Sequence, residues 1–327
     1  MSHTMTALLG GAGPDWVTRE VSVPEPGPGQ VLVRTRAVSL GNADVQMLAS
    51  ADSASGSGNE YVAGYEFAGE IAAVGTDTGL VQVGNHVMGA SPGAFAEYVL
   101  ADHRHVMPIP GSIGHEKASA LPTALFTEHG ALALASFQAG QSVLITGATS
   151  GIGLVGVQIA KALGARTVLA TTRTDARSGL VKTTGADVVI ATTSQNLTKM
   201  VLEATDGQGV DAVLDHVGGQ TLADCLPATR VDGTILNIGR LDQAASTIDL
   251  DALSYRHLRL LGVSYGFSRA AELGGVIAGL TPHVLPAVAD GRIRPVIDTV
   301  FPLAQAKEAA DRMRTNQAQG KVVLVMP

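Results

Sequence analysis

Residues Gln141–Ala165, QSVLITGATSGIGLVGVQIAKALGA, join a short apolar run to a turn rich in glycine and then to a long apolar segment. The run Ser142–Ile145 leads into a glycine turn, which is typical of a strand buried on both faces of a parallel sheet. The segment Ile152–Leu163 is apolar around most of its circumference, and Lys161 and Gly164 mark its end, so we expect a helix. The sequence therefore predicts a strand, a tight turn and a helix in direct succession.

The turn has the spacing G-x-G-x-x-G at Gly151, Gly153 and Gly156. Glycine is needed there because a Cβ atom would keep the backbone amides away from a pyrophosphate, which binds at the positive end of the helix dipole. Glycines occur in many strand-to-helix crossovers, but here the pattern follows a predicted strand and opens a predicted helix. This context predicts a dinucleotide-binding site.

The choice between NADH and NADPH depends on the end of the next strand, which we expect at Arg166–Ala170. In NAD sites an Asp or Glu about 20 residues after the glycines binds the ribose hydroxyls. Here the chain has Thr172, Arg173 and Arg177, which suit a 2′-phosphate that a carboxylate would repel. The sequence therefore favours NADPH. Two alternatives stay open. A small shift of the strand end would place Asp175 where NAD sites carry their acidic residue. Arg173 and Arg177 would also suit the solvated first turn of the next helix, without any contact with a phosphate.

Composition narrows the class of protein. The 327 residues exceed the usual size of one domain, and 46% hydrophobic with 16% charged residues suit a large α/β core. The net charge of −7 argues against a nucleic-acid partner. No apolar run of membrane-spanning length is free of Gly, Pro and charge, and a signal-peptide layout is missing, so we expect a cytoplasmic protein with no membrane partner. Cys225 is the only cysteine, which excludes intrachain disulfides and a cysteine-rich zinc site.

The pattern of elements changes at Leu121. The first 120 residues are mainly β, with period-two alternation in Gln30–Ser39, and Ala49–Asn59 is predicted to be a loop because it is rich in Ser, Gly and Ala. After Leu121 strands and helices alternate, which predicts an α/β fold with a doubly wound parallel sheet. Its ligand belongs at the carboxyl ends of the strands. The tail after Tyr265 is predicted to return to the first domain.

Short motifs in a fixed order cover nearly the whole chain. They are Pro26–Arg34, Asn42–Asp44, Gly64–Gly69, Val74–Gly75, Val83–Val87, Gly93–Tyr98, Leu121–Thr127, the glycine turn, Gly209–Gly219 and Gly320–Leu324. Together they resemble the medium-chain dehydrogenase/reductase superfamily, in the zinc-independent NADPH:quinone oxidoreductase branch that includes zeta-crystallin. The resemblance implies a GroES-like mainly-β catalytic domain at residues 1–122, a Rossmann NADPH-binding domain at 123–265, and a segment at 266–327 that returns to the catalytic domain.

The resemblance also bears on metal. The positions that hold zinc ligands in zinc-dependent relatives correspond here to Gly41, Tyr65 and Ala124, none of which can replace an imidazole or a thiolate. We therefore predict no metal. His103 and His105 share a face of a predicted strand and could bind a metal, but a solvated surface pair is the preferred interpretation.

The resemblance implies a set of residues that contact the cofactor NADPH. Those at the pyrophosphate are Ser150, Gly151, Ile152 and Gly153; those at the 2′-phosphate are Thr172, Arg173 and Arg177; and those around the nicotinamide are Thr127, Val217, Ile238, Gly239, Tyr265, Phe267 and Asn316.

The catalytic residues are less clearly marked. Many relatives carry Asn in the place of Gly41 and Tyr near Gln46, and this chain departs from both. Asn42 and Tyr65 are the catalytic candidates, because an amide or a hydroxyl can donate to the substrate oxygen that gains negative charge. We expect Asp44 and Glu66 to be structural, as buried carboxylates bonded to backbone or to an arginine.

The predicted function is an NADPH-dependent oxidoreductase that transfers hydride to a quinone or another α,β-unsaturated carbonyl acceptor. One alternative is a carbon–carbon double-bond (enoyl) reductase acting on a biosynthetic intermediate, and another is a non-catalytic NADPH-binding protein. The Tyr-x-x-x-Lys motif of short-chain dehydrogenases is missing, since Tyr255 and Tyr265 are each followed four residues later by arginine. The apolar edge strand predicted at Arg259–Val263 suggests a homodimer.

Overall fold

The computed structural model describes residues 4–11, 13–53, 60–111, 113–265, 269–315 and 317–327. The chain forms two compact units. The first unit comprises Met1–Thr123, Gly266–Thr281 and Pro295–Pro327, and the second comprises Ala124–Tyr265 and Pro282–Arg294. The chain therefore enters the second unit twice and ends in the first.

A parallel sheet of six strands, in the order β11-β10-β9-β12-β13-β14, forms the centre of the second unit. From β9 the chain builds outward through β10 to β11, and then in the opposite direction from β12 to β14. The order reverses between β9 and β12, where Ile145 pairs with Leu214. Open α/β sheets bind ligands beside such a reversal. The strands are β9 (Ser142–Ile145), β10 (Thr167–Thr172), β11 (Val188–Ala191), β12 (Val210–Asp215), β13 (Thr229–Asn237) and β14 (Arg259–Gly262).

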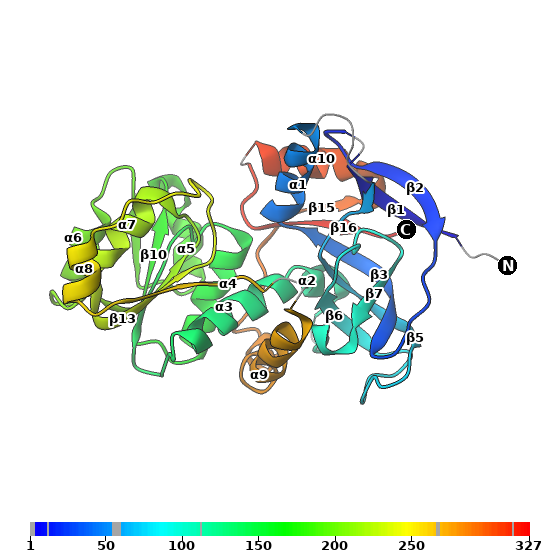
Figure 1. Ribbon diagram of the computed structural model, residues 1–327, viewed down its shortest axis with the longest axis horizontal. Helices are drawn as coiled ribbons and strands as arrows, with labels where there is room; N and C mark the ends of the chain where they lie inside the picture. Colours follow the sequence, from blue (N-terminus) through cyan, green and yellow to red (C-terminus); the bar gives the residue numbers. More distant parts are fainter. Residues whose placement is uncertain (1–3, 12, 54–59, 112, 266–268, 316) are drawn as a thin grey trace. The chain divides into compact units, whose positions relative to one another are not determined.

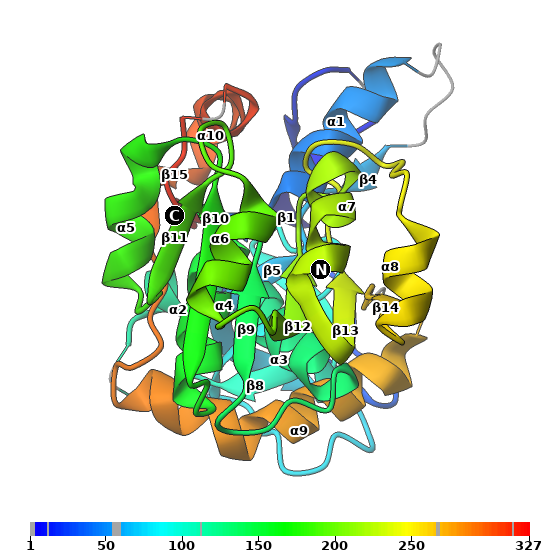
Figure 2. The same cartoon turned by 90° about the vertical axis from the view of Figure 1, so that its left-hand side faces the viewer.

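Helices cover both faces of this sheet. In Figures 1 and 2, α6 and α7 lie on one face, and α3 and α4 lie on the other. Leu144 and Ile190 from the strands are buried together with Val201 and Leu226 from α6 and α7. Burial on both faces explains the continuous apolar strands that the sequence shows. The helices are α3 (Pro122–Leu134), α4 (Gly151–Ala162), α5 (Ser178–Thr183), α6 (Leu197–Ala204), α7 (Gly219–Ala228) and α8 (Leu250–Tyr255), with a 3-10 turn η2 (Asp175–Arg177).

The first unit holds two sheets, of three strands in the order β2-β1-β4 and of seven strands. The larger sheet has the order β15-β16-β3-β5-β6-β8, with β7 also paired to β3. The C-terminal strand β16 pairs antiparallel with β3, with Leu324 opposite Val38. The strands are β1 (Thr4–Gly10), β2 (Val17–Ser22), β3 (Gln30–Leu40), β4 (Tyr61–Val62), β5 (Glu66–Val74), β6 (His86–Ala90), β7 (Tyr98–Asp102), β8 (Val106–Pro108), β15 (Ile297–Pro302) and β16 (Lys321–Val325).

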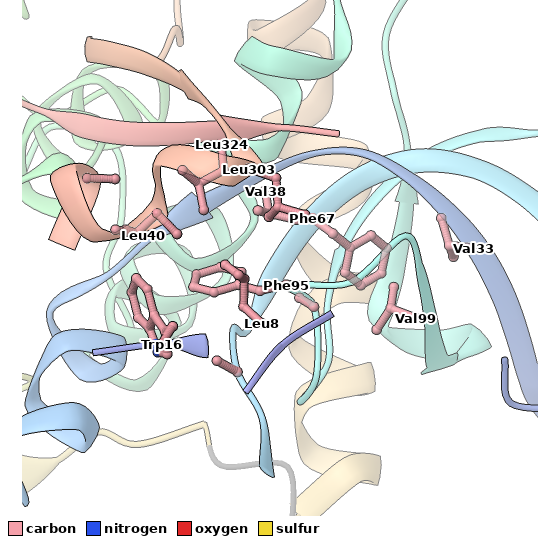
Figure 3. Close-up of a cluster of buried hydrophobic side chains, with 14 of the residues drawn as sticks. Leu8, Trp16, Val33, Val38, Leu40, Phe67, Phe95, Val99, Leu303 and Leu324 are labelled. Atoms are coloured by element: carbon pink, nitrogen blue, oxygen red, sulfur yellow. The ribbon is translucent and has the colours of Figure 1, made fainter. Parts of the chain in front are cut away.

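The core of the first unit combines residues from both ends of the chain. Figure 3 shows Trp16, Phe67 and Phe95 together with Leu303 and Leu324 of the tail. The rings of Trp16 and Phe95 meet edge to face, with centroids 5.2 Å apart, a geometry that aromatic pairs prefer. The helices of this unit are α1 (Asn42–Ser53), α2 (His115–Ser119) and α10 (Ala306–Arg314), with 3-10 turns η1 (His103–His105) and η4 (Leu303–Gln305).

One helix in the described part of the chain, α9 (Ala270–Ala289), is long and apolar enough by composition to cross a membrane. Of its apolar window, 44% is buried within the protein, and the helix contains Pro282 and Pro286. Buried helices of soluble proteins can have the same length and apolar composition, so this single helix is weak evidence for a membrane span.

The structure corrects three local predictions. Ala49–Ser53, predicted to be loop, continues α1, and the rest of that segment (54–59) lies outside the described residues. The second strand of the glycine unit runs on to Thr172 because Thr172 pairs with Ala191 of β11. His103 and His105 lie on the 3-10 turn η1 rather than on one face of a strand.

Candidate functional site

The turn between β9 and α4 presents two backbone donors. Ser150 caps the helix, since its Oγ accepts from the Gly153 amide at 3.0 Å, and the Ser150 amide itself donates to the Gly147 carbonyl at 3.1 Å. Within the described residues, no hydrogen-bond acceptor faces the amides of Gly151 and Ile152. These amides lie at the positive end of a twelve-residue helix, which is a favourable place for an anionic group.

Two glycines bring this turn close to its neighbours. A Cβ atom on Gly153 would lie 2.7 Å from the Ala148 Cα, which is too close for any other residue. Gly147 has a φ of +59°, and its amide donates to the Thr171 hydroxyl at 3.0 Å. The Ala148 amide donates to the Thr171 carbonyl at 2.9 Å. The turn is therefore held against the carboxyl end of β10.

Asp215 anchors the loop that follows β12. Its buried carboxylate accepts from the Thr146 hydroxyl at 2.7 Å and from the Asn237 side-chain amide at 2.9 Å. It also accepts from the backbone amides of Val217 and Gly218, both at 3.1 Å. These bonds join the carboxyl ends of β9, β12 and β13, so Asp215 fixes the shape of this edge of the sheet.

A second buried pair lies beside this loop. The Glu128 carboxylate on α3 is 3.1 Å from His216 Nε2, and both side chains are almost completely buried. Burial lowers the pKa of His216, but the charge of Glu128 raises it and the net direction is upward. Glu128 therefore stabilises the charged form of this imidazole.

The end of β10 carries the residues predicted for the 2′-phosphate. Arg173 is exposed, while its carbonyl accepts from the Thr193 amide and hydroxyl. Thr172 is buried, and its hydroxyl donates to the Thr174 carbonyl at 2.8 Å, so this donor is already in use. Asp175 begins η2 and accepts from the Ser178 hydroxyl at 2.8 Å, while Arg177 ends the same turn. Arg173 is thus more accessible than Thr172 as a candidate for binding the 2′-phosphate.

The residues predicted around the nicotinamide fall in several places of the second unit. Val217 follows β12, and the amides of Ile238 and Gly239 both donate to the Asp215 carbonyl, at 2.7 and 3.0 Å. Thr127 is buried on α3. The structure brings Val217, Ile238 and Gly239 together at the ends of β12 and β13.

Tyr265 belongs to the same predicted set, and its ring packs on α3. The ring meets Phe126 edge to face with centroids 6.2 Å apart, and a Cβ on Gly130 would lie 2.3 Å from the Tyr265 hydroxyl. Its placement over the nicotinamide stays a prediction. Phe267 and Asn316 lie outside the described residues.

A buried ionic cluster occupies the first unit. The Glu66 carboxylate pairs with the Lys321 ammonium group, and both side chains are buried. It also accepts from the Ser39 hydroxyl at 2.6 Å and from the Thr123 amide at 3.1 Å. Glu66 is therefore a structural carboxylate bonded to backbone, as predicted, but its cation is a lysine instead of an arginine.

Asp44 closes the first turn of α1. Its carboxylate accepts from the Gly41 amide at 2.7 Å, in the manner of a capping box. Burial raises the pKa of Asp44 to about 7, the charge of Glu66 adds to the rise, and the Gly41 bond and Lys321 oppose it. Asp44 is thus half protonated near neutral pH.

The two catalytic candidates also lie in the first unit. Asn42 is exposed at the first residue of α1. The Tyr65 hydroxyl is 2.7 Å from the Met47 sulfur, and burial together with the charge of Asp44 raises the pKa of Tyr65. A phenol with a raised pKa remains a hydrogen-bond donor at neutral pH, so Tyr65 keeps the chemical character that its predicted role requires.

Comparison with known proteins places the chain in a family. A family model described as alcohol dehydrogenase GroES-like domain matches residues 27–111, and one described as zinc-binding dehydrogenase matches residues 151–278. A mycobacterial quinone oxidoreductase of known structure is 26% identical with a TM-score of 0.85, covering 98% of this chain and 99% of that chain. The chain belongs to the medium-chain dehydrogenase/reductase superfamily. The predicted fold class, a Rossmann sheet with a GroES-like domain, is confirmed.

Two further relatives of this chain are informative. Mycobacterial Rv1454c complexed with NADPH is 26% identical with a TM-score of 0.84, covering 98% of this chain and 99% of that chain. Phthioceranic/hydroxyphthioceranic acid synthase of Mycobacterium tuberculosis is 33% identical over 305 residues, which is 92% of this chain. The chain spans only 14% of the length of that synthase.

No group of three or more His, Cys, Asp or Glu side chains suited to a metal ion occurs among the residues that the structure describes. The two histidines considered from the sequence have separate partners. His103 Nδ1 lies 2.9 Å from the Gly29 carbonyl oxygen, and His105 Nε2 lies 2.9 Å from that of Ala270.

Sequence reasoning missed the two polar networks of the second unit. Glu128 is a carboxylate in the mainly apolar helix α3, and His216 directly follows the buried strand β12. Charged residues at such positions are rarely buried without a partner. The position of Glu128 in an apolar helix therefore indicates that it has a specific partner, but the sequence alone does not identify that partner.

Proposed function

We propose that this medium-chain reductase binds NADPH along the carboxyl edge of its parallel sheet and transfers hydride to a conjugated carbonyl acceptor. The observation that carries the proposal is the pair of unbonded amides at Gly151 and Ile152, at the N-terminus of α4 and beside the strand reversal. The complex of Rv1454c with NADPH supports the choice of nucleotide.

The residues of this chain fit the nucleotide in three places. The amides of Gly151 and Ile152 would receive the pyrophosphate, with Ser150 and Gly153 shaping the turn. Arg173 would hold the 2′-phosphate, together with Arg177 and with Thr172 nearby. Val217, Ile238 and Gly239 would lie along the nicotinamide, with Thr127, Tyr265, Phe267 and Asn316 completing its surroundings.

The proposed reaction also requires a hydrogen-bond donor for the substrate. NADPH, when bound, supplies the hydride. The oxygen of a quinone or an enone then gains negative charge, and a hydrogen-bond donor stabilises it. Tyr65 is the proposed donor because it keeps its proton at neutral pH, and Asn42 is the alternative. Gly41, Tyr65 and Ala124 provide no zinc ligand, so the proposed reaction is independent of zinc.

A second candidate function has specific support. The similarity to phthioceranic/hydroxyphthioceranic acid synthase extends over 92% of this chain, which favours reduction of a carbon–carbon double bond in a biosynthetic intermediate. A quinone and a 2-enoyl thioester differ in size and in the polarity of the group beyond the carbonyl. Acceptor specificity therefore separates the two functions.

The remaining assignments are also proposals. A homodimer through the edge strand β14 would cover its unpaired backbone groups, and the protein would act in the cytoplasm. A non-catalytic NADPH-binding protein is the alternative to an enzyme, and it would bind the nucleotide without oxidising it in the presence of an acceptor.

The test is NADPH oxidation by the purified protein, in the presence of a chelator, with an ortho-quinone, a para-quinone, an α,β-unsaturated ketone, a 2-enoyl thioester and a simple aldehyde. The same panel is repeated with NADH. Turnover of quinone or enone with preference for NADPH supports the first function, and selective turnover of the thioester supports the second. Binding of NADPH without turnover of any acceptor indicates the non-catalytic protein, and loss of activity with chelator contradicts a zinc-independent reaction.

A further inference from the structure

The proposed function makes no use of the ion pair formed by Glu128 and His216. Glu128 is completely buried in the middle of α3, and His216 directly follows β12. The Glu128 Oε1 and His216 Nε2 atoms lie 3.1 Å apart. Among the described residues, neither the Glu128 carboxylate nor His216 Nε2 has another hydrogen-bond partner. The two groups therefore depend on each other.

The third glycine of the G-x-G-x-x-G pattern makes room for this pair. A Cβ atom on Gly156 would lie 2.3 Å from the Glu128 Oε2 and 2.8 Å from its carboxyl carbon. The carboxylate thus occupies the space that any larger residue on α4 would need. This glycine therefore serves the ion pair, whereas Gly153 serves the contact between the helix and the preceding turn.

The pair joins two elements of the nicotinamide region. Thr127 precedes Glu128 on α3, and Val217 follows His216. Backbone hydrogen bonds hold His216 and Val217 in place. The His216 amide donates to the Thr146 hydroxyl at 2.9 Å, and the Val217 carbonyl accepts from the Asp242 amide at 3.0 Å. The side chains of Glu128 and His216 therefore connect α3 with this loop.

We propose that the Glu128–His216 ion pair positions Thr127 and Val217 around the nicotinamide half of NADPH. The inference rests on the proposed function, because it assumes that NADPH binds along this edge of the sheet. Glu128 and His216 are positioning residues, since they act through their chain neighbours.

A purely structural role makes a different prediction. Replacing a buried ion pair by apolar residues of similar volume is often neutral or stabilising, whereas removing one partner leaves a buried charge and destabilises the fold. A double apolar variant should therefore restore stability whatever the role of the pair. It should restore nucleotide binding only if the pair has no positioning role.

The experiment uses the full chain and three variants: Glu128→Gln, the double variant Glu128→Leu with His216→Leu, and Asp211→Asn. Asp211 is the matched control, because it lies near the amino end of β12, where it accepts from the Ser142 amide and hydroxyl. The dissociation constants of NADPH and of 2′-phospho-ADP-ribose, which lacks nicotinamide, are measured by titration. Thermal unfolding reports the stability of each variant.

We expect both Glu128 variants to bind NADPH about tenfold more weakly, which corresponds to the loss of one hydrogen-bond-sized interaction at the nicotinamide. Both should bind 2′-phospho-ADP-ribose as tightly as the original protein does, because this ligand has no nicotinamide. The control should leave both constants unchanged. Equal weakening for the two ligands, unchanged NADPH binding, or recovery of NADPH binding in the double variant overturns the positioning role. If the original protein binds neither ligand, the proposed function itself fails, and the positioning role fails with it.

Discussion

Replacing Asp44 by Asn should stabilise the first unit, and the gain should grow as the pH rises. Burial raises the pKa of the Asp44 carboxyl from 3.8 to about 7. Below pH 3.8 the carboxyl is protonated in both the folded and the unfolded protein, so it contributes nothing. Between these values the unfolded chain loses the proton while the folded protein keeps it, and stability falls. Above pH 7 the whole cost applies.

The magnitude follows from the size of the shift. A difference of roughly three pKa units, at about 1.4 kcal/mol each, gives about 4 kcal/mol of destabilisation at pH 8 and about 2 kcal/mol at pH 5. The bond from the Gly41 amide already opposes the rise in this pKa, and the asparagine keeps an oxygen that can accept from that amide, so no separate cost is subtracted. The gain expected for Asp44→Asn is therefore about 4 kcal/mol at pH 8 and about 2 kcal/mol at pH 5.

Trp16 provides the assay, because it is the only tryptophan of the chain and is buried in the core of the first unit. Denaturant unfolding followed by its fluorescence at pH 5 and pH 8 measures the stability of this unit. Asp290→Asn is the control, since Asp290 is exposed and lies in the second unit. A variant at Asp44 that is less stable than the original protein at pH 8, or a difference that does not change with pH, would refute the reasoning.

Three further predictions concern single contacts. Lys321→Met should cost about 3 to 5 kcal/mol, because it leaves the Glu66 carboxylate buried without its cation, and the Trp16 transition at pH 7 measures it. Gly156→Ala should cost about 1 to 3 kcal/mol through overlap with Glu128, and a second change, Glu128→Ala, should relieve part of that overlap; thermal unfolding compares the variants. Arg173→Ala should weaken NADPH binding about tenfold to a hundredfold and leave NADH binding unchanged, as titration of both would show; equal loss for both contradicts the assignment.

Local patterns in the sequence were enough to predict the sheet of the second unit. The strand, glycine turn and helix around Gly151 form from neighbouring residues, and alternation of strands and helices fixes the parallel arrangement. Strand ends were less accurate because pairing partners determine them. β10 reaches Thr172, beyond the predicted end at Ala170, by pairing with Ala191.

The sequence indicated the part of the candidate site that consists of backbone amides. It did not indicate the contacts between side chains that are far apart in the sequence. The amides of Gly151 and Ile152 follow from the glycine spacing. The pairing of Glu66 with Lys321 joins residues 255 positions apart, and the pairing of Glu128 with His216 joins residues 88 positions apart. No local pattern indicates which charged groups meet in this way, because the contact is created by the tertiary fold.

The pairing of β16 with β3 has a consequence for synthesis on the ribosome. Residues 30–40 of β3 are translated well before the strand that pairs with one of their edges, Lys321–Val325. The second unit receives its final segment, Pro282–Arg294, before that point. We therefore expect vectorial folding in which the second unit is complete while one edge of β3 still awaits its partner. During that interval the nascent first unit exposes an open strand edge, the kind of surface that chaperones shield from aggregation.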